Sequence, residues 1–253
     1  MSSFFTKISI LLIFGMMFFN SFLSAQEKTN PWFFEPNPDL PNVLILGDSI
    51  SEGYTLPVRK LLHGKANVYR PMNAKNTAPE NCGNTKMGLR NLDRWVDTKQ
   101  INSKKWDVIH FNWGLWDINR RIPHNQDNTG IRDKINGTIS FTEKEYAENL
   151  EKIVEKLKKT DAKLIWGSTS FVPEGEEGRV SGDEIKYNNA AAKVMKNHHI
   201  PINNIHELTS RFEPSLFRGP RDVHYKSAGS QKIAEQVAEQ IQKILGNISV
   251  ESF

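Results

Sequence analysis

The sequence has very little cysteine and no strong excess of charge of either sign. Cys82 is the only cysteine in 253 residues, so no disulfide can form within the chain, and no CxxC or Cys/His pair suggests zinc. Basic residues number 33 against 29 acidic ones and are spread along the chain, which argues against a dedicated nucleic-acid-binding protein. HExxH, calcium-loop, GxGxxG and Walker patterns are missing too, so no metal or nucleotide cofactor is implied.

Long apolar runs are missing after the N-terminus. Lys7 precedes an apolar run over residues 8–19, and small residues follow up to Ala25. The run is shorter than the roughly 20 residues that span a bilayer, so residues 1–25 are predicted to be a cleaved signal peptide rather than a membrane anchor. We therefore expect a secreted or periplasmic protein without stable membrane insertion. An uncleaved anchor is the alternative.

Strand and helix patterns alternate along the rest of the chain. Residues 26–40 are rich in Pro, Asn and Glu and are predicted to form an N-terminal arm, followed by one domain over residues 41–253. The predicted strands cover residues 43–46, 68–70, 106–113, 163–171 and 200–205, and the predicted helices cover residues 51–62, 88–96, 142–157, 183–197 and 227–245. This alternation predicts an α/β fold, a three-layer α/β/α sandwich with a five-stranded parallel sheet.

Three segments interrupt the alternation, and each follows a predicted strand. They cover residues 118–141, 172–182 and 206–225. Because the strands are predicted to be parallel, all three segments should lie at the carboxyl edge of the sheet, where open α/β sheets place their functional sites.

Ser49 lies at the junction between the first predicted strand and the helix that follows. A serine there has its own N–H among the free donors of a helix start, which stabilise developing negative charge, so it is well placed to be a nucleophile. Asp and Ser are also ordinary N-cap residues, and Ser49 as a helix cap is the alternative at this point.

A serine nucleophile needs a base, and histidine is the usual one. His224 lies just before the final predicted helix, at the same edge as Ser49, with the carboxylate of Asp222 two residues away. That carboxylate could orient the imidazole and stabilise its protonated form. His110, in the middle of a predicted strand, is expected to be a buried core residue instead.

Four short motifs in order resemble those of the SGNH, or GDSL-type, hydrolases, a family of serine esterases. They are Gly47-Asp48-Ser49-Ile50, Cys82-Gly83-Asn84-Thr85, Gly114-Leu115-Trp116-Asp117 and Asp222-Val223-His224. The resemblance spans about 200 residues and implies a flavodoxin-like α/β/α fold. It also implies Ser49 as nucleophile, His224 as base, Asp222 as the third member, and the Ser49 and Gly83 N–H groups as oxyanion donors.

Two positions depart from the family pattern. Trp116 stands where most members have an asparagine that donates to the oxyanion; an indole N–H could replace it, or Trp116 could have a packing or sugar-stacking role. Asn112 lies four residues earlier, too far along an extended strand to substitute. The acid is also usually three residues before the histidine rather than two. If Asp222 cannot reach the ring, a backbone carbonyl or water would orient His224.

The predicted function is ester hydrolysis through an acyl-enzyme, most consistent with a carbohydrate O-acetylesterase whose substrate is a small-molecule or polysaccharide ester. Trp113, Asp117 and Arg120 are candidate substrate-binding residues, and the same edge offers further aromatic and cationic side chains at Trp116, Arg121, Arg179 and Arg218. A lipase, lysophospholipase or thioesterase for longer acyl chains is one alternative. The other is an inactive carbohydrate-binding protein on the same scaffold. The oligomeric state is left open.

Overall fold

The computed structural model describes residues 30–102, 104–122 and 130–251. The chain divides into two compact units, Met1–Glu35 and Pro36–Phe253. In the described part of the first unit, the Asn30 side chain accepts a hydrogen bond from the Trp32 N–H at 3.1 Å, which forms a turn. The predicted signal peptide, residues 1–25, lies outside the described residues.

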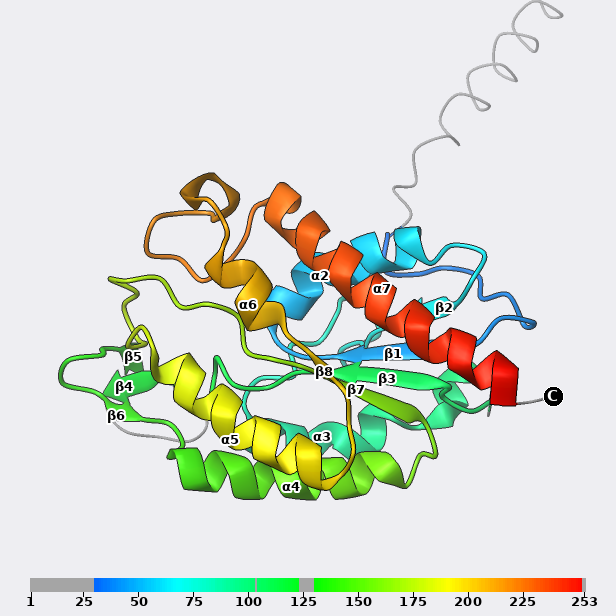
Figure 1. Ribbon diagram of the computed structural model, residues 1–253, viewed down its shortest axis with the longest axis horizontal. Coiled ribbons are helices and arrows are strands. Elements are labelled where there is room, and N and C mark those ends of the chain that lie inside the picture. The colour runs from blue at the N-terminus through cyan, green and yellow to red at the C-terminus, as the bar shows by residue number, and fades with distance from the viewer. Residues whose placement is uncertain (1–29, 103, 123–129, 252–253) are drawn as a thin grey trace, which may run out of the picture. The chain divides into compact units, whose positions relative to one another are not determined.

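The second unit is built on a five-stranded sheet in the order β2-β1-β3-β7-β8 (Figure 1). Its strands are β1 (Asn42–Leu46), β2 (Asn67–Tyr69), β3 (Val108–Phe111), β7 (Lys163–Gly167) and β8 (Ile202–Asn203). Every neighbouring pair is parallel. The predicted five-stranded parallel sheet is therefore confirmed, although β3, β7 and β8 are shorter than the sequence pattern suggested.

Helices cover both faces of the sheet (Figure 1). They are α2 (Ser49–Leu61), α3 (Thr85–Trp95), α4 (Glu143–Lys158), α5 (Asp183–Asn197), α6 (Ile205–Ser210) and α7 (Ser227–Glu251), with 3₁₀ turns η1 (Thr98–Ile101) and η2 (Pro214–Leu216). Helices α2 and α7 pack together on one face, and α3, α4 and α5 lie side by side on the other. Gly53 allows the close approach of α7 to α2, because a Cβ there would lie 2.9 Å from the Ser230 hydroxyl. The three-layer α/β/α sandwich is thus confirmed.

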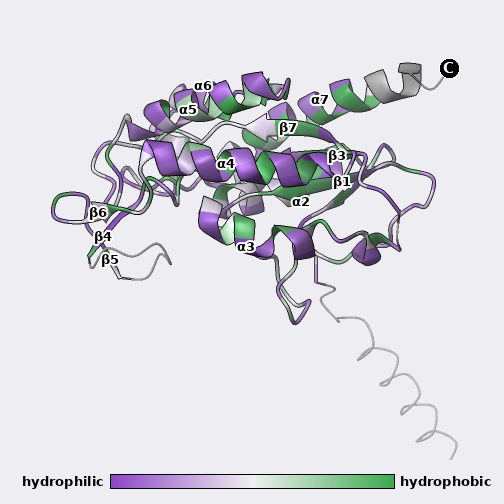
Figure 2. Cartoon of the chain, turned by 90° about the horizontal axis from the view of Figure 1, so that it is seen from below, coloured by the Kyte–Doolittle hydropathy of each residue, from purple (hydrophilic) through white to green (hydrophobic). Residues whose placement is uncertain are grey.

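The core lies between these layers. Figure 2 shows β1 and β3 almost entirely in the hydrophobic colour, while α4 alternates between hydrophobic and hydrophilic residues. Every residue of β1 and β3 is buried, which is why both strands read as continuous apolar runs. The exception in β3, His110, is buried as expected: its Nε2 accepts a hydrogen bond from Asn203 at 3.1 Å, and burial lowers its pKa to about 4.

Some elements were not predicted. The segment over residues 118–141 contains a small antiparallel sheet in the order β5-β4-β6, formed by β4 (Arg120–Ile122), β5 (Ile131–Arg132) and β6 (Thr138–Ile139). Strands of two or three residues are too short to show an alternating pattern, and α6, with six residues, is too short for a clear helical one. The second compact unit starts at Pro36, and the Asn37 backbone hydrogen-bonds the Asn67 side chain.

The cap of α4 gives a first prediction. Thr142 Oγ1 accepts from the Glu145 N–H, and the Glu145 carboxylate accepts from the Thr142 N–H, a complete capping box. Replacing Thr142 with Ala should lower the free energy of unfolding by about 1 kcal/mol, because one N–H of the first turn loses its acceptor. Urea denaturation measures this, and Thr142→Ser, which keeps the hydroxyl, should unfold like the unmodified protein. Equal stability of the Ala variant would contradict the role of the cap.

Candidate active site

The turn between β1 and α2 presents the Ser49 hydroxyl at the carboxyl edge of the sheet. Asp48, not Ser49, is the N-cap: its Oδ1 accepts from the Ile50 N–H at 2.9 Å. Burial raises the pKa of Asp48, although that hydrogen bond and nearby arginines act in the opposite direction. Gly47 is required at the turn, because a Cβ would lie 2.8 Å from the Ser51 hydroxyl. The cap is thus filled by Asp48, and the half-buried Ser49 side chain is left for another contact.

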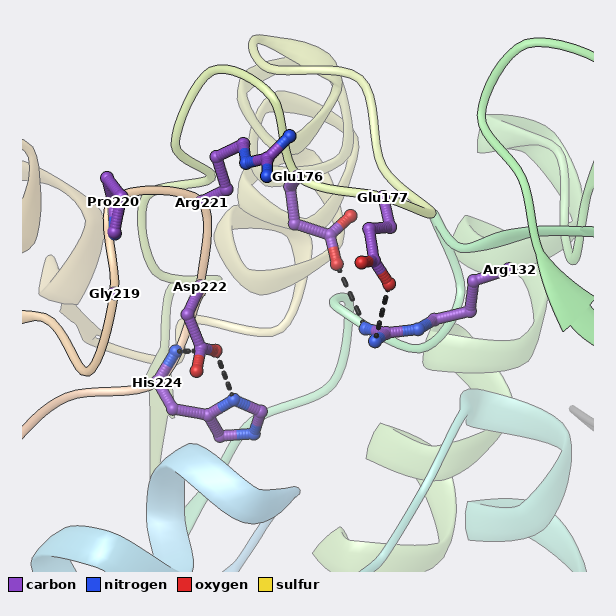
Figure 3. A pocket seen from close by; sticks show the side chains of 8 residues that line it. All are labelled: Arg132, Glu176, Glu177, Gly219, Pro220, Arg221, Asp222 and His224. Carbon is purple, nitrogen blue, oxygen red and sulfur yellow. Dashed lines mark hydrogen bonds and ion pairs between the residues drawn. The ribbon is translucent and has the colours of Figure 1, made fainter.

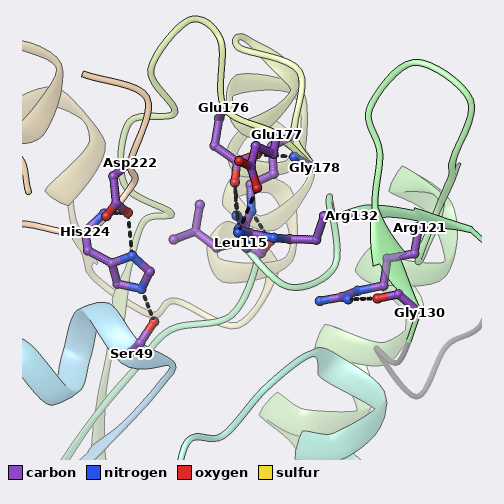
Figure 4. A network of polar contacts seen from close by, with 11 residues as sticks. Ser49, Leu115, Arg121, Gly130, Arg132, Glu176, Glu177, Gly178, Asp222 and His224 are labelled. Carbon is purple, nitrogen blue, oxygen red and sulfur yellow. Dashed lines mark hydrogen bonds and ion pairs between the residues drawn. The ribbon is translucent and has the colours of Figure 1, made fainter. Parts of the chain in front are cut away.

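That contact is with His224, in the loop between η2 and α7 (Figure 4). Ser49 Oγ and His224 Nε2 are 2.9 Å apart, although the two residues are 175 positions apart in the chain. Asp222 Oδ1 lies 2.6 Å from His224 Nδ1 and also accepts from the His224 backbone N–H at 2.9 Å. An Nδ1–H held by the carboxylate leaves Nε2 as an acceptor, the tautomer that a base for Ser49 needs.

Asp222 reaches the ring from two residues away because its side chain turns back along its own loop, as in an Asx turn. Partial burial raises the pKa of Asp222, but the hydrogen bonds from the backbone and ring of His224, together with the charges of His224 and Arg218, lower it overall. Asp222 therefore carries its negative charge beside the imidazole. The structure thus brings together, in one continuous hydrogen-bonded chain, the three residues that the motifs singled out: Ser49, His224 and Asp222.

Arg70 supports the turn that carries Ser49, and sequence reasoning missed it. Its guanidinium donates to the Gly47 carbonyl at 2.7 Å, to the Ser51 hydroxyl at 2.6 Å and to the Glu80 carbonyl at 3.0 Å. Arg70 is only 4% exposed, directly after the edge strand β2. A buried arginine must have acceptors around it. In the sequence, the only sign of this role was the position of Arg70 at the end of a predicted strand.

The segment that carries Gly83 lies against the nucleophile turn, because the Cys82 N–H donates to the Gly47 carbonyl at 3.0 Å. Gly83 has φ +63°, and a Cβ there would also collide with the Met87 side chain, so glycine is required. Its N–H, however, donates to Asn81 Oδ1 at 2.9 Å. An oxyanion would therefore compete with Asn81 Oδ1 for the Gly83 N–H, a contact that the motif did not reveal.

Trp116 is half-buried and packs against the core, which fits the packing role among those considered for it. Asn112 is not a replacement oxyanion donor. It is buried, and its Nδ2 donates to the Gly167 carbonyl at 2.6 Å. The amide is thus engaged in joining the end of β3 to β7.

The expectation that Trp113 contacts substrate is wrong. Its ring is fully buried, and its Nε1–H donates to the Cys82 carbonyl at 3.2 Å. Gly88 makes room for it, since a Cβ on α3 at that position would lie 3.0 Å from the indole. Trp113 therefore links two of the motif segments from within the core.

Asp117 is likewise not open to substrate. It is fully buried and accepts from the Thr85 N–H at 3.0 Å and the Thr85 hydroxyl at 2.6 Å, which anchors the start of α3. Arg120 is mostly buried, and its guanidinium forms an ion pair with Asp183 at 2.7 Å. The expectation that Asp117 and Arg120 bind substrate is therefore wrong as well. Both side chains are engaged by other residues of the protein.

Other cations of this edge are also engaged. Arg179 is 5% exposed and donates to the Leu115 carbonyl and to Glu176. Arg121 donates to the Gly130 carbonyl at 2.6 Å (Figure 4). Arg218 stays exposed, with one long contact to the Tyr225 carbonyl.

A pocket of about 420 Å³ opens beside the imidazole (Figure 3). Its lining consists of Arg132, Glu176, Glu177, Gly219, Pro220, Arg221, Asp222 and His224. The described residues contain no group of three or more His, Cys, Asp or Glu side chains placed to hold a metal ion. Among the described helices, none is long and apolar enough to cross a membrane.

Solved structures share this fold. A lipase/acylhydrolase from Enterococcus faecalis is 16% identical with a TM-score of 0.60, covering 81% of this chain and 96% of that one. An acetylxylan esterase from Geobacillus stearothermophilus, solved as a catalytic mutant, is 14% identical with a TM-score of 0.59, covering 79% and 94%. A GDSL-like lipase from Bacteroides thetaiotaomicron is 15% identical with a TM-score of 0.54, covering 86% and 94%. The chain therefore has the SGNH hydrolase-like α/β fold that its motifs predicted. No family model and no curated protein matches the sequence.

Arg70 gives the second prediction. Arg70→Met should lower the free energy of unfolding by about 3 kcal/mol, because several buried acceptors lose their donor at about 1 kcal/mol each. Arg70→Lys should recover part of this loss, since one ammonium reaches fewer acceptors. Arg90→Met, at an exposed position of α3, is the matched control and should change stability little. Urea unfolding measures the stability of all three variants. Equal stability of the two Met variants would contradict the stabilising role of Arg70.

Asp117 gives the third prediction. Burial raises its pKa to about 7, although the hydrogen bonds from Thr85 act in the opposite direction. The folded state then binds the proton more tightly than the unfolded state, so stability from this group is greatest below about pH 4 and is lost as pH rises towards 7. In urea unfolding, the unmodified protein should lose stability relative to Asp117→Asn across that window, by at most about 1.4 kcal/mol per pH unit. Parallel pH profiles would contradict it.

Proposed function

We propose that this protein is a secreted serine ester hydrolase that removes acetyl groups from carbohydrates. The observation that carries the proposal is the continuous chain from Ser49 Oγ through the His224 imidazole to the Asp222 carboxylate, with contacts of 2.9 and 2.6 Å. These distances are within the range for a nucleophile, a base and a group that orients the base.

In the proposed reaction, His224 Nε2 takes the proton of Ser49 as Oγ bonds to the ester carbonyl carbon. The carbonyl oxygen becomes an oxyanion, and Asp222 stabilises the imidazolium that has formed. When the tetrahedral intermediate collapses, His224 gives its proton to the departing alcohol and Ser49 keeps the acyl group. Water then attacks the acyl-enzyme with His224 as base again, which releases the acid and restores Ser49.

The oxyanion would be held first by the Ser49 N–H. This group belongs to the first turn of α2, where N–H groups have no carbonyl partner within the helix. The Gly83 N–H would contribute if the incoming oxyanion displaces Asn81 Oδ1, and the Trp116 indole is a further candidate. Each well-placed donor is worth about 3–4 kcal/mol in the transition state.

Acetyl esters of carbohydrates are favoured over long acyl chains by the pocket beside His224. Five of its eight lining residues are charged and the others are Gly219, Pro220 and His224, so no Val, Leu, Ile, Met or Phe side chain is among the lining residues. A lipase or thioesterase for long chains needs an apolar groove instead. An inactive binding protein is disfavoured because His224 faces Ser49 rather than turning away from it. Acetyl xylan esterases among the structural neighbours support the same substrate class.

The fourth prediction concerns the two residues that carry the chemistry. Ser49→Ala and His224→Ala should each lower kcat/KM for p-nitrophenyl acetate by at least about 1,000-fold, since either change removes nucleophilic attack. Asp222→Ala should lower it less, because the base remains. Release of acetate and p-nitrophenol measures all three, with Ser215→Ala, at an exposed serine, as control. Equal slow rates in every variant would mean background hydrolysis and would overturn the proposal.

The substrate class is tested separately. Acetylated glycans should release acetate in the presence of the unmodified protein and not with Ser49→Ala. Long-chain acyl lipids serve as the competing substrates. Turnover of the lipids without release of acetate from any glycan would replace the acetylesterase assignment with the lipase alternative.

A further inference from the structure

The pocket beside His224 contains charges of both signs, and its carboxylates already have partners. Glu176 is 2% exposed, and its Oε1 lies 2.9 Å from Arg179 and 3.1 Å from Arg132, while its Oε2 accepts from the Gly178 N–H. Glu177 pairs with Arg132 at 3.3 Å. These two carboxylates are therefore already paired, with Arg179 of the same loop and with Arg132 of β5.

Asp222, the remaining acid of the pocket, is held by both the backbone and the ring of His224. Of the two arginines that line the pocket, Arg132 is shared between Glu176 and Glu177. The positive charge of Arg132 is thus balanced by two carboxylates of the loop that precedes α5.

Arg221 differs from these groups. Within the described part of the chain, its guanidinium has neither a hydrogen bond nor an ion pair, and the residue is exposed. Its aliphatic stem lies against Gly175: a Cβ there would come 2.6 Å from Arg221 Cδ, and φ at Gly175 is +80°. In Figure 3 the side chain extends from the loop of His224 towards Glu176. Gly175 thus leaves space for the stem and for an unpaired cation at the pocket rim.

We propose that Arg221 is a specificity-determining residue that binds an anionic substituent on the saccharide part of the substrate. This substituent is a carboxylate or a sulfate. This inference rests on the proposed function, since the same His224 lines the pocket and serves as base. A guanidinium suits either group because its planar N–H donors match paired oxygens. The neighbouring Arg218 is exposed too and adds positive charge to the loop that carries the base.

The test uses three methyl glycosides acetylated at the same hydroxyl: the neutral glucoside, the glucuronoside and the 6-sulfated glucoside. The measured quantity is the kcat/KM for acetate release from each anionic ester, divided by that for the neutral one. Arg221→Gln should lower this ratio about tenfold for at least one anion, and Arg221→Lys should retain part of it. If the ratio falls for only one of the two anionic esters, the result identifies whether the carboxylate or the sulfate is recognised.

Lys243→Gln is the matched control, because it removes the same charge from an exposed side chain of α7. It should leave the ratio unchanged. An equal fall in this variant would mean that net charge, not Arg221, sets the preference, and an unchanged ratio in Arg221→Gln would overturn the proposal.

Binding without turnover separates this inference from the proposed function. In the Ser49→Ala background, calorimetric titration should show tighter binding of the anionic glycosides than of the neutral one, and the added Arg221→Gln should weaken only this preference, again about tenfold. If no ester is hydrolysed but this pattern appears, the enzyme assignment fails and the anion site stands. If hydrolysis depends on Ser49 but no variant changes the preference, the anion site fails alone.

Discussion

The contact between Ser49 Oγ and His224 Nε2 is the interaction on which the proposed activity depends. It joins residues 175 positions apart, so no local structure can create it. The parallel sheet brings the two ends together: β1 delivers Ser49 to the carboxyl edge, and α7, packed against α2 on the same face, fixes the loop that precedes it. Gly53, whose lack of a side chain lets α7 approach α2 closely, serves this geometry directly.

Buried polar side chains hold the loops of this edge in place. Arg70 ties the nucleophile turn to the segment before α3, Asp117 ties the start of α3 to the loop after β3, and Arg179 ties that loop to the segment before α5. Burying such groups is costly unless their partners are complete, so each one favours a single loop arrangement over its alternatives. The geometry of the Ser49 site thus depends on buried residues outside the Ser49–His224–Asp222 chain.

The five parallel strands, the layers and the residues brought together at Ser49 were predictable because each rests on strong local signals. Continuous apolar runs mark β1 and β3, a capping box marks α4, and the motifs mark Ser49, His224 and Asp222. The roles of Trp113, Asp117 and Arg120 were not predictable, because a motif shows which residues lie near the site but not which way they point. Arg70 and the Asn81 contact to Gly83 arise only from tertiary structure. The short strands β4, β5 and β6 are too brief to show a period.

The central claim is that Ser49 is a nucleophile activated by His224, and covalent labelling tests it most directly. The native protein is treated with a fluorophosphonate, and peptides are then mapped by mass spectrometry. The account predicts one adduct, on the peptide that carries Ser49, which is absent from His224→Ala and from the urea-unfolded chain. Equal labelling of native and unfolded protein, or an adduct elsewhere with Ser49 unmodified, would contradict it.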